Sequence, residues 1–197
     1  MFSRNRLIAL TILVVAFTLT ACGGGKPSSS NGQSTMPAVS NGEGGGEGGV
    51  EAALVTYTDS SQGFSIGHPG TWTQDPAFTP GVKFVGGDSV MTLEFVTPPT
   101  GSDGLTYAQS DIATVTAAFP GFKQLSLAAS TEVRDAVVLG FTANGISAVT
   151  GKTFTAHNER YYISLSDGRI AVLTVAGPEN IYDREGIRDI ALTFKIK

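Results

Sequence analysis

The stretch Phe64-Ser-Ile-Gly-His-Pro-Gly-Thr-Trp72 contains the change of backbone direction on which the fold of this chain depends. Phe64 and Ile66 alternate with small or polar residues, which is typical of a strand with one buried face. Pro69 ends the strand pairing because proline has no backbone N–H, and the glycine after it favours a turn. Trp72 follows at once, and we expect it to fold back onto the core.

Alternating and helical patterns on both sides of this stretch predict further elements. The predicted strands are two short ones around an Asp-Ser-Ser-Gln-Gly turn in residues 57–67, a hairpin of 82–85 and 89–96, an edge strand at 122–127, and strands at 131–141, 146–154, 161–165 and 169–175. Helices are predicted at 105–119, with Thr106 as the cap candidate, and at 180–193. Connections of hairpin length favour an antiparallel sheet. We therefore expect an α+β fold over residues 51–197, with an antiparallel sheet sandwiched between helices.

These residues resemble the PsbP-like family at three places. Phe64 to Trp72 is similar to the family's opening, where an extended strand runs into a proline turn and a tryptophan. Ser166 to Thr174 resembles a later strand entered from an Asp-Gly turn, and Ile190 to Phe194 resembles the family's ending. His68 stands where the family usually has tyrosine. The residues that carry the fold motif are Phe64, Pro69, Trp72, Asp167 and Gly168.

The resemblance has implications for fold and function. The family includes the extrinsic PsbP proteins of photosystem II, bacterial envelope lipoproteins of the LpqN and DcrB kind, and a Ran-binding import factor. It implies an α/β/α sandwich that acts in binding or assembly and is not an enzyme.

The N-terminus has the pattern of a bacterial lipoprotein export signal. Arg4 and Arg6 precede an apolar stretch, residues 7–19, of about 13 residues, whereas a membrane-spanning helix needs about 20. The stretch ends in a lipobox with small residues before the chain's single cysteine, namely Leu19, Thr20, Ala21 and Cys22. We expect residues 1–21 to be a signal peptide and Cys22 to be lipidated. An ordinary signal peptide with an unrelated cysteine, or an uncleaved anchor helix, are the alternatives.

Residues 22–50 predict a lipidated cysteine followed by a disordered tether. The segment is rich in Gly and Ser and has almost no apolar residues to bury. A flexible coil of this length has a root-mean-square reach of roughly 30 Å. We therefore expect the domain to stay close to the outer face of a membrane of the cell envelope while remaining free to reorient.

Composition excludes several function classes. The full chain has a formal charge of −4, and cleavage before Cys22 removes Arg4 and Arg6, which leaves 11 basic and 17 acidic residues. Such a domain has no electrostatic footprint for nucleic acid, and charge alone does not attract it to anionic lipids. A single cysteine allows no intrachain disulfide and no cysteine-based zinc site.

The remaining candidates for chemistry form no catalytic pattern. His68 and His157 have no partners at a ligand spacing, so we expect structural histidines and no metal site. Residues 151–153 resemble the end of a phosphate loop but lack its first glycine. The charges of the last predicted helix indicate a solvated face; they are Glu179, Asp183, Arg184, Glu185, Arg188 and Asp189. We predict no catalytic residues and no cofactor.

The sequence therefore favours a non-enzymatic binding or assembly module. Its predicted partners are the membrane, through the lipid anchor, and a membrane-associated protein complex or a small apolar ligand. A hydrolase-like enzyme with an unrecognised site and a purely structural envelope protein remain alternatives. The sequence does not decide the oligomeric state.

Overall fold

The computed structural model describes residues 53–183 and 186–197. The predicted signal peptide, the lipobox from Leu19 to Cys22, and the predicted tether lie outside the described residues.

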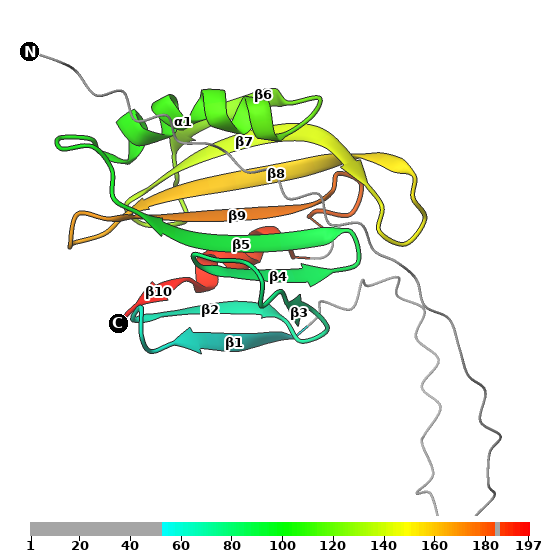
Figure 1. Ribbon diagram of the computed structural model, residues 1–197, viewed down its shortest axis with the longest axis horizontal. Helices are drawn as coiled ribbons and strands as arrows, with labels where there is room; N and C mark the ends of the chain where they lie inside the picture. The colour runs from blue at the N-terminus through cyan, green and yellow to red at the C-terminus, as the bar shows by residue number, and fades with distance from the viewer. Residues whose placement is uncertain (1–52, 184–185) are drawn as a thin grey trace, which may run out of the picture. The chain divides into compact units, whose positions relative to one another are not determined.

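A seven-stranded antiparallel sheet forms the centre of the fold (Figure 1). Its strands lie in the order β3-β4-β5-β9-β8-β7-β6. In chain order they are β3 (Thr73–Gln74), β4 (Val82–Gly86), β5 (Ser89–Val96), β6 (Lys123–Ala129), β7 (Ala136–Ile146), β8 (Thr153–Ser164) and β9 (Ile170–Pro178). All residues of β9 from Ile170 to Gly177 are buried, because layers cover both faces of the sheet there. The predicted hairpin of β4 and β5 and the predicted edge position of β6 are confirmed.

A second sheet of three strands contains the stretch that begins at Phe64. Its order is β1-β2-β10, with β1 (Leu54–Asp59), β2 (Phe64–Pro69) and β10 (Lys195–Ile196). The turn between β1 and β2 is fixed by Asp59, whose Oδ1 accepts hydrogen bonds from the backbone N–H groups of Ser61 and Gln62 at 2.8 and 3.0 Å. The C-terminal strand β10 pairs with the start of β2.

The first predicted helix is present as α1 (Gly104–Ala118), but its cap differs from the prediction. Asp103 is the N-cap, and its Oδ1 accepts a hydrogen bond from the backbone N–H of Thr106 at 2.8 Å. Thr106 therefore lies inside the first turn, where its N–H needs a partner, and the preceding carboxylate provides one.

The second predicted helix, residues 180–193, is wrong in extent and type. Among the described residues of this range, η1 (Arg188–Thr193) alone is helical, and it is a 3₁₀ helix. Gly186 has φ of +61°, a left-handed conformation that an α-helix does not accommodate, so the helix cannot run through it. The apolar stripe is nevertheless buried as expected, since Ile187, Ile190 and Ala191 are all in the core.

The predicted strand at 146–154 is also wrong, because it contains the loop between β7 and β8. Ile146 ends β7 and Thr153 begins β8. Between them, the Ser147 N–H donates to the carbonyl of Lys152 at 2.9 Å, and Gly151 has φ of +69°. A left-handed glycine here reverses the chain and closes a long hairpin.

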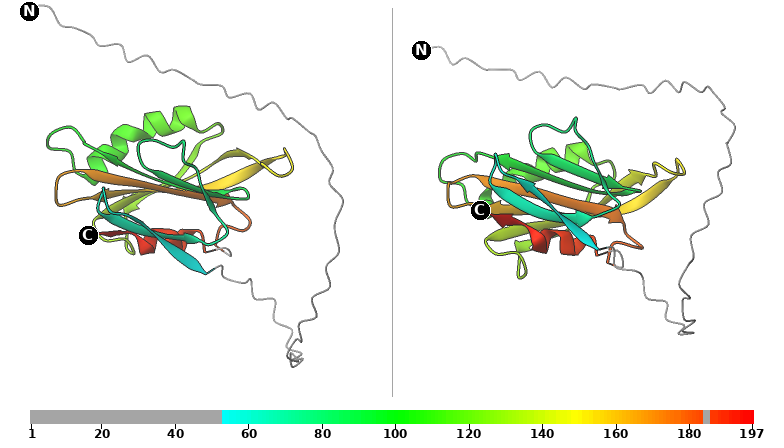
Figure 2. Two further views of the ribbon diagram at one scale, coloured as in Figure 1. Left: turned by 60° about the horizontal axis from the view of Figure 1, so that its bottom comes forward. Right: turned by 90° about the horizontal axis from the view of Figure 1, so that it is seen from below.

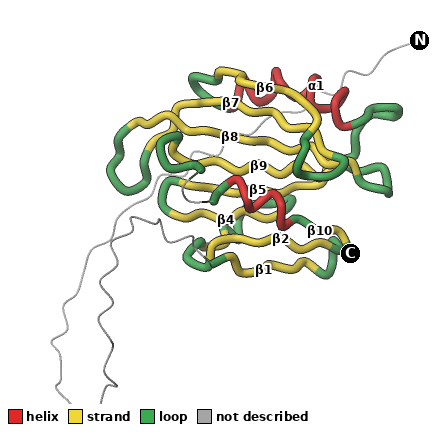
Figure 3. The backbone as a smooth tube through the Cα atoms, turned by 180° about the vertical axis from the view of Figure 1, so that it is seen from behind, coloured by secondary structure: helices red, strands yellow, loops and turns green. Residues whose placement is uncertain are grey.

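The two faces of the large sheet are covered differently, so the predicted sandwich between helices is seen only in part. On one face α1 packs over β7 and β8 around Leu139, Phe141 and Tyr162. On the other face, η1 and the small sheet cover Leu173 and Val175 of β9 (Figures 2 and 3). The fold class is α+β and the sheets are antiparallel. An α-helix covers one face of the large sheet, whereas a short 3₁₀ helix and a second sheet cover the other. Within the described residues, no helix is long and apolar enough to cross a membrane.

The opening stretch connects the small sheet to the large one. Trp72 lies against the backbone of Gly86, where a Cβ would fall 2.0 Å from the indole ring. His68 stacks on Phe84 of β4, with ring centroids 3.9 Å apart. Thr193 Oγ1 accepts a hydrogen bond from the Gly67 N–H at 2.7 Å, which joins η1 to β2. The predicted return of Trp72 to the core is therefore observed.

Candidate functional site

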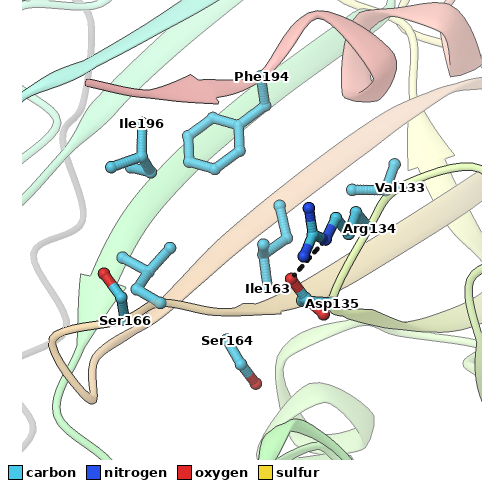
Figure 4. Close-up of a pocket in the computed structure, with 9 residues that line it drawn as sticks. Val133, Arg134, Asp135, Ile163, Ser164, Ser166, Phe194 and Ile196 are labelled. Carbon is cyan, nitrogen blue, oxygen red and sulfur yellow. Dashed lines mark ion pairs between the residues drawn. The ribbon is translucent and has the colours of Figure 1, made fainter.

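A cavity of about 400 Å³ lies at the end of the domain where β8 turns into β9 (Figure 4). The loop between β6 and β7, the end of β8 with its turn, and the segment from η1 into β10 line it. Its apolar lining consists of Val133, Ile163, Leu165, Phe194 and Ile196. Its polar lining consists of Arg134, Asp135, Ser164 and Ser166. Three segments far apart in the sequence therefore build one mainly apolar cavity.

The Asp-Gly turn of the fold motif shapes one wall. Asp167 Oδ1 accepts a hydrogen bond from the Arg169 N–H at 3.0 Å, and this bond holds the pKa of Asp167 below its ordinary value. The Gly168 N–H donates to the Leu165 carbonyl at 3.1 Å, and Gly168 has φ of +84°. This turn therefore fixes Leu165 and Ser166 at the cavity edge.

The loop between β6 and β7 forms the second wall and is held by local hydrogen bonds. Ser130 Oγ accepts a hydrogen bond from the Val133 N–H at 2.9 Å. The Asp135 carbonyl accepts one from the Ser164 N–H at 2.9 Å, so the loop is joined to the end of β8. Asp135 has φ of +56°, which aspartate tolerates better than bulkier residues do. The wall is therefore preorganised without being part of either sheet.

Aromatic rings support the third wall. Phe194 lies beside Phe64 of β2, with ring centroids 6.3 Å apart, and Phe64 in turn packs on Phe95 at 5.4 Å. The guanidinium of Arg169 lies 5.0 Å from the Phe95 ring centre, within the range of a cation–π contact. The first residue of the fold motif thus supports a cavity residue from behind.

The mouth of the cavity carries one pair of opposite charges. Arg134 Nε lies 3.2 Å from Asp135 Oδ2, and the two side chains are 94% and 65% exposed. Figure 4 shows them pointing toward one another beside Ile163. Such an exposed pair contributes little energy and adds no net charge. The cavity can therefore take an uncharged apolar group, and its polar lining is limited to the paired charges of Arg134 and Asp135 and the hydroxyls of Ser164 and Ser166.

A buried polar cluster lies elsewhere, beneath α1, around Arg160 of β8. Arg160 Nε donates to Asp111 Oδ2 of α1 at 3.1 Å, and its Nη1 donates to Thr174 Oγ1 at 2.8 Å. Its Nη2 lies 3.4 Å from Glu94 Oε1, and the Tyr162 hydroxyl also donates to Asp111 at 2.9 Å. Burial alone lowers the pKa of Arg160, but Tyr162, Asp111 and Glu94 outweigh it and keep the guanidinium charged. The cluster joins the helix to the sheet.

A second polar cluster lies on the opposite face of β8, around Glu159. The Tyr161 hydroxyl donates to Glu159 Oε2 at 2.5 Å. His157 Nε2 and Arg188 Nε lie 3.8 and 3.9 Å from Glu159 Oε1. Burial opposes ionisation of Glu159, but His157, Tyr161 and Arg188 outweigh it and lower its pKa. The neighbouring Tyr182 is 3% exposed, and its hydroxyl has no hydrogen-bond partner among the described residues.

The structure places the remaining predicted residues as follows. The His157 ring packs against Tyr182 at a tilt, with ring centroids 4.5 Å apart, and does not meet His68, which packs on Phe84. Pro69 and Trp72 lie away from the cavity, near the turn between β4 and β5. Arg188 pairs with Glu132 at 3.0 Å and is not on a solvated α-helix. Arg184 and Glu185 lie outside the described residues.

The sequence did not predict the cavity or the polar clusters around Arg160 and Glu159. Residues 163 and 165 were expected only as members of a strand, and Arg160 and Asp111 are 49 positions apart. Alternation along β8 does indicate that Glu159 and Arg160 face opposite sides, but not which groups they meet. Within residues 53–183 and 186–197, no three His, Cys, Asp or Glu side chains are grouped closely enough to hold a metal ion.

No family model and no curated protein matches the chain. Solved structures do match its fold. The cyanobacterial PsbP protein of Synechocystis sp. PCC 6803 aligns with a TM-score of 0.53 and 16% identity, over 79% of this chain and 98% of that one. The Ran-binding protein Mog1p of Saccharomyces cerevisiae aligns with a TM-score of 0.52 and 10% identity, over 74% and 96%. LpqN of Mycobacterium tuberculosis, a protein described as involved in cell envelope biogenesis, aligns with a TM-score of 0.42 and 16% identity, over 74% and 91%.

These alignments establish the fold alone. The domain has a PsbP-like fold, as the resemblance of its motifs implied. Fold does not fix function, so the site must carry the functional argument.

Proposed function

We propose that this chain is a membrane-anchored extracytoplasmic lipoprotein whose PsbP-like domain is a non-enzymatic binding or assembly module. Lipid on Cys22 holds the domain at the outer face of a membrane of the cell envelope. The cavity at the turn between β8 and β9 receives an apolar group, either a small ligand or a side chain of a membrane-associated protein.

The observation that carries the binding role is the separation of the cavity from the ionisable groups. Arg160 and Glu159, with their partners, lie on the two faces of β8 and do not line the cavity. The groups that do line it are mostly aliphatic or aromatic, and the charges at its mouth are paired. An enzyme needs a nucleophile, acid or base within reach of its substrate. A binding module needs an apolar concavity with a few polar groups at its rim.

The shared fold supports the same role. The aligned yeast protein is named for binding Ran, and the aligned cyanobacterial protein is named for PsbP. Neither name describes an enzyme. We take from them only that this fold serves binding.

The anchor is tested with Cys22→Ser in cells. We expect wild-type protein in the membrane fraction, with incorporation of labelled palmitate, and the variant in the soluble fraction at normal thermal stability. Cys22 is the chain's single cysteine, so no other thiol can replace it. Variant protein that stays with the membrane would refute the lipid anchor.

The cavity is tested by photo-crosslinking in the same cells. A crosslinking amino acid replaces Ser166, which lines the cavity, or Gln109, which is exposed on α1. We expect adducts from position 166 alone, and we expect Ile196→Ser to reduce them because Ile196 is a lining residue that is 44% exposed. Equal adducts at both positions, or none at position 166, would contradict binding in the cavity.

A further inference from the structure

The hairpin between β7 and β8 has an apolar tip that is exposed. Ile146 and Val149 are 76% and 79% exposed, the highest values of any large apolar side chains in the described residues. No charged residue occurs between Asp135 and Lys152. Figure 1 shows this hairpin projecting beyond the neighbouring strands. Exposed aliphatic groups on an uncharged projection cost hydration free energy unless a partner covers them.

The tip holds a defined shape. The Gly151 N–H donates to the Ser147 carbonyl at 2.8 Å, and the Thr150 N–H donates to Ser147 Oγ at 3.1 Å. The Ala148 N–H donates to Asp88 Oδ1 at 2.9 Å, which ties the tip to the turn between β4 and β5. Hydrogen bonds therefore present the two aliphatic side chains outward.

The domain begins at the same end as this tip. Leu54 at the start of β1 pairs with Pro69 at the end of β2. Three residues later, Trp72 packs on Gly86, the last residue of β4 before its turn into β5. That turn also carries Asp88, which binds the tip. This series of contacts places the start of β1 at the same end of the domain as the tip of the hairpin between β7 and β8.

This end also gathers exposed apolar side chains. Leu54 and Val55 of β1 are 39% and 45% exposed. With Ile146 and Val149 they make up four of the eight exposed large apolar side chains among the described residues. The other four are distributed over α1, β6, η1 and β10. We call these four residues, Leu54, Val55, Ile146 and Val149, the apolar end.

We propose that the apolar end contacts the lipid surface of the membrane that carries the anchor, with the tip at Ile146 and Val149 entering the headgroup region. This inference rests on the proposed lipid anchor. Residues 23–52 separate Cys22 from the first described residue, and a coil of that length reaches roughly 30 Å. The tether enters the domain at this end, so the proposed contact of the apolar end with the bilayer is compatible with the anchor.

The charge of the domain indicates which kind of lipid surface the apolar end contacts. The mature chain is acidic, so attraction to anionic headgroups does not drive the contact. Burial of aliphatic side chains drives the contact instead, and this burial is equally favourable on a zwitterionic bilayer. Two side chains provide weak binding, but a short tether converts it to an intramolecular event at an effective concentration of order millimolar. The contact should thus form in the anchored protein and be undetectable in the free one.

The test uses the full lipoprotein in phosphatidylcholine vesicles. Ala148→Cys places a single free thiol between Ile146 and Val149, because Cys22 is taken up by lipid. An environment-sensitive fluorophore is attached there, or at the matched control Thr100→Cys. Thr100 is exposed and follows β5 at its far end from the turn that holds Asp88.

We expect the fluorophore at position 148 to be at least threefold less accessible to a water-soluble quencher than the one at position 100. The double change Ile146→Ser with Val149→Ser, made in the Ala148→Cys protein, should remove the difference. Circular dichroism and thermal unfolding of each variant verify the fold. Equal quenching at positions 148 and 100 in anchored wild-type protein overturns the proposal. So does protection that occurs only in native membranes and not in pure lipid, because that result assigns the tip to a protein partner.

Failure of the inference and failure of the proposed function are distinguishable. If the Cys22→Ser form stays bound to vesicles or cell membranes, the anchor itself is wrong. If the wild-type protein is anchored but its tip is quenched freely, the anchor stands and only the lipid contact of the apolar end is lost.

Discussion

The two faces of strand β8 carry polar clusters of similar composition, but the central side chains of the two clusters differ in how many hydrogen bonds they make. On the α1 face, Arg160 is the central cation, and carboxylates from α1 and β5 with a hydroxyl from β9 meet it at 2.8 to 3.4 Å. On the η1 face, Glu159 is the central anion, and among the residues that the structure describes only the Tyr161 hydroxyl lies within hydrogen-bond distance of its carboxylate. One cluster is fully hydrogen-bonded, and the other is loosely held.

The difference follows from the elements that face each cluster. The regular helix α1 presents Asp111 at a fixed height over the sheet, so its carboxylate meets both Arg160 and Tyr162. The element facing Glu159 is the 3₁₀ helix η1, and Arg188 at its start is half exposed. Charges that are held in place and shielded from water interact more strongly than charges that move in it. We therefore expect the α1 side to contribute more stability than the η1 side.

Replacement of Arg160 should have the largest effect. Arg160→Met keeps most of the side-chain volume but leaves Asp111 without its cation beneath α1. Breaking a buried ion pair by removing one partner costs about 3 kcal/mol of unfolding free energy. Urea unfolding measures it, with Arg134→Met as the control because Arg134 is 94% exposed. The control should change stability by less than about 0.5 kcal/mol. A loss for Arg160→Met no greater than that of the control would contradict the comparison.

Removal of one hydroxyl on the α1 face should have an intermediate effect. Tyr162→Phe deletes the donor to Asp111, while the ring remains packed edge-on to Tyr107 at 6.0 Å. A hydrogen bond to a charged group contributes about 2 kcal/mol. The same unfolding measurement detects the loss. If Arg160→Met is combined with Tyr162→Phe, the two losses should not add, because both changes act on Asp111. Strict additivity would show that the groups act separately.

The contribution of the η1 face to the free energy of unfolding should depend on pH. The pKa of Glu159 is lowered from its ordinary value of 4.5, so its ionised form favours the folded state. That contribution is present above pH 4.5 and is lost as the pH falls through the lower folded pKa. Glu159→Gln should therefore cost about 1 kcal/mol at neutral pH and progressively less below pH 4.5. Unfolding curves between pH 3 and 7 measure it. A penalty that stays constant over this range would show that the charge of Glu159 is not involved.

The sequence predicts the elements with strong local patterns. The helix α1 has apolar residues at helical spacing and a Pro-Gly stop after Phe119, and it forms nearly as predicted. Residues 180–193 have the same kind of spacing, but Gly186 takes a left-handed conformation, and among the described residues of this range only Arg188–Thr193 is helical. Periodicity identifies which side chains are buried. It does not ensure that the backbone between them is helical.

The sequence does not predict features that depend on distant segments. Strands β3 and β10 are two residues long and have no pattern of their own. The cavity combines a loop, a strand end and the C-terminus, and no spacing in the sequence links Val133 to Phe194. The fold motif is the exception, because its Asp-Gly turn at 167–168 could be found in advance and proves to shape a cavity wall.

The smallest expected change in the free energy of unfolding comes from replacing Tyr182, and unlike the other substitutions it should not destabilise the protein. Tyr182 is 3% exposed on the η1 face, and its hydroxyl is unpaired among the described residues. Burial raises the pKa of this hydroxyl, so it stays neutral. A buried hydroxyl without a partner loses its hydration without compensation, which costs about 1 kcal/mol or more. Tyr182→Phe should therefore be neutral or should stabilise the protein by up to about 1 kcal/mol, since the ring and its contact with His157 remain.

The matched control for this change is Tyr161→Phe, the same substitution on the same face. The Tyr161 hydroxyl donates to Glu159 at 2.5 Å, so its removal should destabilise the protein by about 1.5 kcal/mol. Two identical substitutions beside one carboxylate are thus expected to shift the unfolding midpoint in opposite directions. If Tyr182→Phe is as damaging as Tyr161→Phe, the Tyr182 hydroxyl has a partner in solution. The η1 face would then be as fully hydrogen-bonded as the α1 face, and the inequality between the two clusters would disappear.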